Sequence, residues 1–134
     1  MNRSTRGPLR RTFWQSLLYA LSGLAYAVRA QRNFRIDIIF VGVVLGAVIL
    51  FAALGKPVNL AEGVALTVTV GLVLFAELVN SVAEAIVDLL VEQYHEKARV
   101  AKDVAAGAVL ITALVAIIVG AMIFLPRLVE LLRE

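Results

Sequence analysis

The chain has 134 residues, of which 61% are hydrophobic and 17% charged, and its mean hydropathy is +0.91. This is far more apolar than the core of a soluble domain of that length requires, so we predict a single all-α membrane domain. Cysteine is absent, which excludes disulfides, thiolate metal sites and cysteine nucleophiles. The net charge of +3 alone would be compatible with nucleic acid, but in a membrane protein the distribution of basic residues matters more, and we expect no nucleic-acid partner.

The N-terminal part of the chain is polar and basic. Residues 1–11 hold four arginines without apolar periodicity, which predicts a basic arm. Over residues 12–34 apolar side chains recur every three or four positions, while Gln15, Ser22 and Arg29 interrupt any continuous apolar run. This pattern predicts an amphipathic helix lying on the membrane surface. A signal peptide is the alternative, although the broken apolar run favours the surface helix.

Two long apolar segments follow. Residues 36–54 form the first predicted span, because the stretch from Ile38 to Leu54 carries no charge and reaches about 25 Å as a helix. Pro57, in the turn GKPVN, ends it, since the residue before a proline disfavours helix. The second helix, residues 60–91, is longer than a bilayer requires, so its far end should project beyond the hydrocarbon.

The C-terminal part holds the third span. Residues 92–103 are predicted to be a short polar connection or a helical extension. Residues 104–125 carry no charge and form the third span, which we expect to end at Pro126. Residues 126–134 make a short tail of mixed charge.

The basic residues give the predicted orientation. Ten of the thirteen lysines and arginines lie before the first span or in residues 92–103, and three lie in the other two flanking segments. Because positive charge gathers on the cytoplasmic side, we expect the N-terminus and residues 92–103 to be cytoplasmic. This predicts a multi-pass protein of a prokaryotic inner membrane with its polar groups on the cytoplasmic side.

The second helix carries a polar stripe. At about 100° per residue, Glu77, Asn80, Glu84 and Asp88 fall in one sector, with Ser81 beside them. A charge inside a span costs roughly 3 kcal/mol, so the stripe is a candidate functional site. Oxygen donors at this spacing suit Mg²⁺, and a carboxylate among like charges is suited to take a proton from an alcohol. Alternatively, the stripe binds neighbouring helices, or Asp88 simply reaches water.

Three segments together resemble a known family. ELVNSVAEAIVD (77–88), EQYHEKARVAKD (92–103) and RNFRID (32–37) are similar to the prokaryotic integral-membrane diacylglycerol kinases and undecaprenol kinases. The combined pattern covers nearly the whole chain and is highly specific. The resemblance implies homotrimers of three-span subunits that share sites between chains. It also implies Mg²⁺-dependent transfer of the ATP γ-phosphate to a lipid hydroxyl, with diacylglycerol favoured over undecaprenol as the acceptor.

The resemblance also implies roles for individual residues. Glu77 matches the general base, and Glu84 and Gln31 match the metal ligands, although the family usually has glutamate at the position of Gln31. Asp37 stands where the family often has histidine or glutamate. Implied contacts with ATP come from Tyr19, Asp88, Glu92, His95, Lys102 and Asp103. Supporting positions are Asn80, Ser81 and Gly23.

Two other classes of function remain open from the sequence. In a proton- or cation-coupled transporter, Glu77 and Glu84 would load and release ions, but that class needs acidic residues near the membrane midplane, whereas here they gather towards one surface. A catalytically lapsed assembly subunit is the other, because the amide of Gln31 is a weaker Mg²⁺ ligand than a carboxylate. The aliphatic acceptor pocket does not separate diacylglycerol from undecaprenol.

Overall fold

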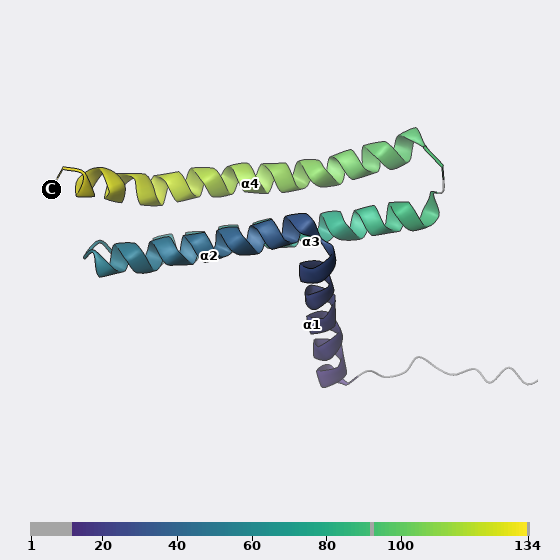
Figure 1. Ribbon diagram of the computed structural model, residues 1–134, viewed down its shortest axis with the longest axis horizontal. Coiled ribbons are helices and arrows are strands. Elements are labelled where there is room, and N and C mark those ends of the chain that lie inside the picture. Colours follow the sequence, from purple (N-terminus) through teal and green to yellow (C-terminus); the bar gives the residue numbers. More distant parts are fainter. Residues whose placement is uncertain (1–11, 92, 134) are drawn as a thin grey trace, which may run out of the picture.

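The computed structural model describes residues 12–91 and 93–133, which form four helices: α1 (Phe13–Ala30), α2 (Arg32–Ala53), α3 (Leu60–Leu90) and α4 (Glu96–Leu131). Helices α2, α3 and α4 lie side by side, and α1 runs crosswise to them (Figure 1). Helices α2, α3 and α4 are long and apolar enough to cross a membrane. The all-helical architecture with three apolar spans is therefore confirmed, whereas the predicted basic arm and Glu92 lie outside the described residues.

Short polar motifs begin three of the helices. Thr12 and Gln15 form a reciprocal capping box at α1, and Asn59 and Glu62 form another at α3, where the two hydrogen bonds measure 2.9 and 2.7 Å. At α4 the Nδ1 atom of His95 accepts a hydrogen bond of 3.2 Å from the Lys97 N–H. Each motif satisfies N–H groups that have no partner within the helix. The starts of α1, α3 and α4 are thus fixed by local sequence.

The junction between α1 and α2 differs from the prediction. Helix α1 ends at Ala30 instead of continuing to residue 34, because Gln31 adopts an extended conformation with φ −98° and ψ 116°. The guanidinium of Arg35 donates a hydrogen bond of 2.8 Å to the Arg29 carbonyl, which satisfies one of the free carbonyls at the end of α1. Asn33 therefore belongs to the first turn of α2 and not to α1.

Helix α4 is longer than the predicted third span at both ends. It begins at Glu96, so most of residues 92–103 take the helical alternative, and it does not end at Pro126 but continues to Leu131. The proline ring removes the N–H that would bond to the Met122 carbonyl. The next carbonyl, of Ile123, accepts a hydrogen bond of 2.6 Å from the Arg127 guanidinium as the helix continues.

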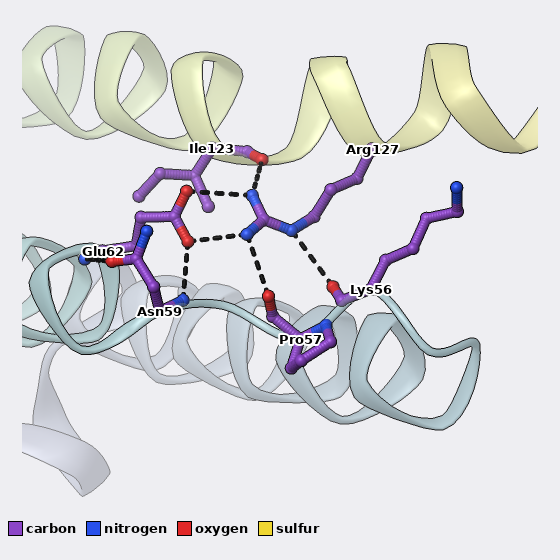
Figure 2. Close-up of polar contacts among 6 residues, drawn as sticks. All are labelled: Lys56, Pro57, Asn59, Glu62, Ile123 and Arg127. Carbon is purple, nitrogen blue, oxygen red and sulfur yellow. Dashed lines mark hydrogen bonds and ion pairs between the residues drawn. The ribbon is translucent and has the colours of Figure 1, made fainter.

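Arg127 fixes the α2–α3 loop against α4 (Figure 2). Its guanidinium forms a two-pronged ion pair with Glu62, at 2.6 and 3.1 Å, and also donates to the backbone carbonyls of Lys56 and Pro57. Glu62 accepts in addition from the Asn59 N–H, so the ion pair also secures the start of α3. This planar fork of donors meets a matching set of acceptors at the end of the bundle away from the polar stripe.

Helix α3 is the most buried element of the described chain. Its buried residues lie along one face of the helix, in which Ala76 and Glu77 are neighbours and the other steps are three or seven positions: Leu66, Thr69, Ala76, Glu77 and Asn80. Most large apolar side chains of α2, α3 and α4 are nevertheless exposed, as expected for surfaces that meet lipid or another chain. The inner part of the polar stripe thus points into the bundle and not outward toward acyl tails.

Candidate active site

Glu77 is the centre of the polar interior. It is 2% exposed and lies on α3, close to Asn33 and Asp37 in the first turns of α2. The side-chain amide of Asn33 is within hydrogen-bonding reach of its carboxylate, and the carboxylates of Asp37 and Glu84 are close enough for their charges to interact with it. A carboxylate in this position is shielded from bulk water and has an amide donor close by.

One and two turns further along α3, Asn80 and Glu84 supply oxygen atoms on the same face. Asn80 is 4% exposed, and its Nδ2 donates a hydrogen bond of 3.2 Å to Glu84 Oε1. Its Oδ1 is buried and has no hydrogen-bond partner among the described residues, and the same holds for the Ser81 hydroxyl. Glu84 and Asn80 therefore combine a carboxylate with an amide oxygen that accepts no hydrogen bond from the described residues.

This donor set bears on the magnesium ion that the resemblance implies. Within residues 12–91 and 93–133 no three Asp, Glu or His side chains are grouped to hold a metal ion, and no hydrogen bond joins Gln31 to Glu84. Mg²⁺ needs only one or two carboxylates from the protein when phosphates and waters complete its shell. Glu84 and Asn80 offer two oxygen ligands of the kind that Mg²⁺ prefers.

At the far end of the stripe, α3 and α4 are joined by an ion pair. Lys102 Nζ lies 2.7 Å from Asp88 Oδ1, with 38% and 66% of the two side chains exposed. The structure thus brings together two of the residues predicted to contact ATP. They sit about 16 Å from Glu77 along α3, in a solvated position.

The remaining polar groups at this end form a network around the start of α4. The Tyr94 hydroxyl donates a hydrogen bond of 2.5 Å to Glu96, which raises the pKa of Tyr94 above its ordinary value. Arg99 pairs with Glu96 at 2.6 Å and with Asp103 at 3.5 Å. His95 lies in this segment too, as the N-cap of α4. The predicted ATP contacts His95 and Asp103 thus lie at the N-cap and in the first turns of α4, the helix that also carries Lys102.

Two predicted positions lie apart from this group within one chain. Tyr19 and Gly23 are on α1, which runs away from the bundle (Figure 1), and Tyr19 is about 18 Å along that helix from Gln31. Glu92 lies outside the described residues. A single chain does not bring Tyr19 and Gly23 to the polar interior around Glu77.

The structure also adds two residues that the sequence reading did not assign to the site. Asn33 and Asp37 are one turn apart on α2, so they share a face, and both are neighbours of Glu77. The signal was present as two polar residues four positions apart at the start of an apolar run.

Comparison with known proteins gives a consistent result. The family model for prokaryotic diacylglycerol kinase matches residues 18–124. A diacylglycerol kinase of Synechocystis sp. is 47% identical over 133 residues, covering 93% of this chain and 73% of that protein. An undecaprenol kinase of Bacillus subtilis is 33% identical, covering 95% of this chain and 98% of that protein. A diacylglycerol kinase of Escherichia coli is 38% identical over 100 residues, covering 75% of this chain and 78% of that protein.

Proposed function

Because this chain belongs to the prokaryotic diacylglycerol kinase family, we propose that its candidate active site transfers the γ-phosphate of ATP to the hydroxyl group of a membrane lipid. The names of its relatives denote lipid kinases, so the enzyme class is that of a lipid kinase. Diacylglycerol is the proposed acceptor, since the relative with 47% identity carries that name. Undecaprenol is the second candidate, because the Bacillus subtilis relative is matched over nearly its whole length.

The observation that carries the chemistry is the burial of Glu77 beside Asn33. A carboxylate in this position is suited to accept the proton of a lipid hydroxyl while the hydroxyl oxygen attacks the γ-phosphorus. The bond between the γ-phosphorus and the bridging oxygen breaks, and ADP leaves with its electron pair. Asn33 orients the carboxylate and does not itself exchange a proton.

The nucleotide would bind at the solvated end of the stripe. In the chain as described, Lys102 pairs with Asp88, and a phosphate of ATP would become the alternative partner of its ammonium group. Asp88, His95, Asp103 and Glu92 are proposed to lie around the nucleotide. Glu84, together with Gln31 and with Asn80 in support, would hold a magnesium ion, which when bound offsets the negative charge of the phosphates.

The assembly we propose is a homotrimer with sites shared between chains. Tyr19 and Gly23 lie far along α1 from the Glu77 of their own chain, so their part in the site requires a neighbouring subunit. The crosswise direction of α1 relative to the three spans supports a position along the membrane surface (Figure 1). With the basic residues on the inner side, the site would open to the cytoplasm of a prokaryotic cell.

The test of this function is ATP consumption by the purified protein in lipid bilayers, with diacylglycerol or undecaprenol added. We expect lipid-stimulated turnover that is lost in Glu77→Gln and kept in Glu130→Gln, a matched substitution at an exposed position at the other end of the bundle. Stimulation by one lipid alone identifies the acceptor. Absence of stimulation by either lipid would favour an ion-coupled transporter or a subunit without catalytic activity.

A further inference from the structure

A groove of 360 Å³ lies between α2, α3 and α4 in the apolar part of the bundle. Its lining consists of aliphatic and aromatic side chains with one exception, Asp37. Along α2 the groove extends from Asp37 to Val44, which is about 10 Å of helix. It therefore has a single charged end and an apolar body, the shape that a lipid with one polar group requires.

The charged end has an unused hydrogen-bond acceptor. Asp37 Oδ2 is buried and has no hydrogen-bond partner among the described residues. A buried carboxylate oxygen without a donor is unfavourable, so its presence in a folded protein points to a donor that arrives with a ligand. The donor must come from a molecule that fits the apolar groove beneath it, which makes a hydroxyl on a hydrocarbon chain the matching chemistry.

The groove also opens next to the proposed catalytic carboxylate. Asp37 and Glu77 are close enough for their charges to interact, and Val73, which lines the groove, is one turn of α3 away from Glu77. A lipid chain lying in the groove would thus present its polar end at Glu77. Two neighbouring carboxylates at this point also repel any headgroup that is itself negative.

We propose that Asp37 determines which lipid enters the site, by accepting a hydrogen bond from the neutral hydroxyl and by repelling the phosphorylated product. This inference rests on the proposed function. The hydroxyl keeps its proton while it is bound to Asp37, and rotation about the lipid C–O bond redirects that proton to Glu77 in the transfer step. After transfer, the negative phosphate ester faces Asp37, which weakens binding of the product.

Two substitutions separate the two roles of Asp37. Asp37→Leu removes both the acceptor and the charge, whereas Asp37→Asn keeps an acceptor oxygen and removes only the charge. The probes are dioctanoylglycerol, its 3-deoxy analogue without the hydroxyl, and dioctanoyl phosphatidic acid, with binding measured in zwitterionic bilayers without ATP. The KM values for the lipid and for ATP are then measured in the same variants.

We expect the unsubstituted protein to bind dioctanoylglycerol about tenfold more tightly than the deoxy analogue, because a tenfold difference in affinity corresponds to the net contribution of roughly one hydrogen bond. Asp37→Leu should abolish this preference and raise the KM for lipid while the KM for ATP stays within about twofold. Asp37→Asn should keep most of the preference but bind phosphatidic acid several-fold more tightly. An unchanged preference in Asp37→Leu, or equal changes in both KM values, would overturn the proposal. If Asp37→Leu does not fold, unchanged binding of phosphatidic acid in Asp37→Asn has the same force.

The body of the groove is tested separately. Ala116→Leu places a larger side chain in the groove and should weaken lipid binding, whereas Ala52→Leu, on the exposed far end of α2, should not. If Ala116→Leu alters the oligomeric state and leaves lipid binding unchanged, the groove is an interface between copies of the chain and the proposal fails. Selective lipid binding without ATP turnover would instead support the groove and reject the proposed kinase activity.

Discussion

Removing the amide of Asn33 should slow phosphoryl transfer without weakening substrate binding. Glu77 is 2% exposed and the amide of Asn33 lies near its carboxylate, so Asn33→Ala removes a hydrogen-bond donor beside a group that has little contact with water. A hydrogen bond to a charged group contributes about 2 kcal/mol, which corresponds to a fall of about 30-fold in kcat if the bond serves entirely to orient the base. The KM for ATP should change little, because the Lys102–Asp88 pair lies about 16 Å away along α3.

The assay is steady-state phosphorylation of diacylglycerol in bilayers, with kcat and both KM values determined for Asn33→Ala, Asn33→Gln and the unsubstituted chain. Asn33→Gln keeps an amide on a longer side chain and should recover part of the rate. A kcat unchanged in Asn33→Ala, alongside an inactive Glu77→Gln, would show that Asn33 does not position the carboxylate. Equal loss of kcat in all variants together with a lower melting temperature would indicate a role in folding only.

Three further predictions concern the rest of the chain. Arg127→Gln should lower the midpoint of thermal unfolding, and adding Glu62→Gln should lower it little further, because both substitutions break the same ion pair. Arg133→Gln is the control. Additive losses of stability in the double variant would contradict this coupling. Lys102→Met should raise the KM for ATP about tenfold while Lys97→Met does not, and equal KM values would remove Lys102 from the nucleotide site. The Tyr94 phenol should titrate above its ordinary pKa of 10.0, and Glu96→Gln should lower that pKa, as followed by ultraviolet absorbance. The contribution of the Tyr94–Glu96 hydrogen bond to stability is complete below pH 10 and is lost as the pH rises through the folded-state pKa of Tyr94.

The part of the site that follows from helical periodicity could be predicted from the sequence. The spacing of Glu77 and Asn80 placed them on one face of a helix, and the structure buries that face inside the bundle. The residues of α2 that lie opposite Glu77, Asn33 and Asp37, could not be predicted from periodicity in the same way. The break at Gln31 has no glycine or proline to mark it, so the boundary between α1 and α2 could not be fixed from the sequence.

Long-range contacts were also beyond reach of the sequence. Glu62 and Arg127 are 65 positions apart, and no local pattern connects them, yet their ion pair joins the α2–α3 loop to α4. Pro126 suggested a helix end, but α4 continues to Leu131 past the carbonyl that the proline leaves without a partner. Tyr19 and Gly23 illustrate a different limit, because on our proposal their place in the site depends on a second chain.

The central claim is that Glu77 takes the proton of a lipid hydroxyl as phosphate is transferred. Its most direct test is a single-turnover measurement of labelled γ-phosphate transfer from ATP to diacylglycerol in bilayers, comparing Glu77→Gln with the unsubstituted chain at equal ATP occupancy. We predict a transfer rate lower by about 100-fold or more, with ATP affinity unchanged, as expected for loss of a general base. Transfer at the unsubstituted rate by Glu77→Gln would contradict the account.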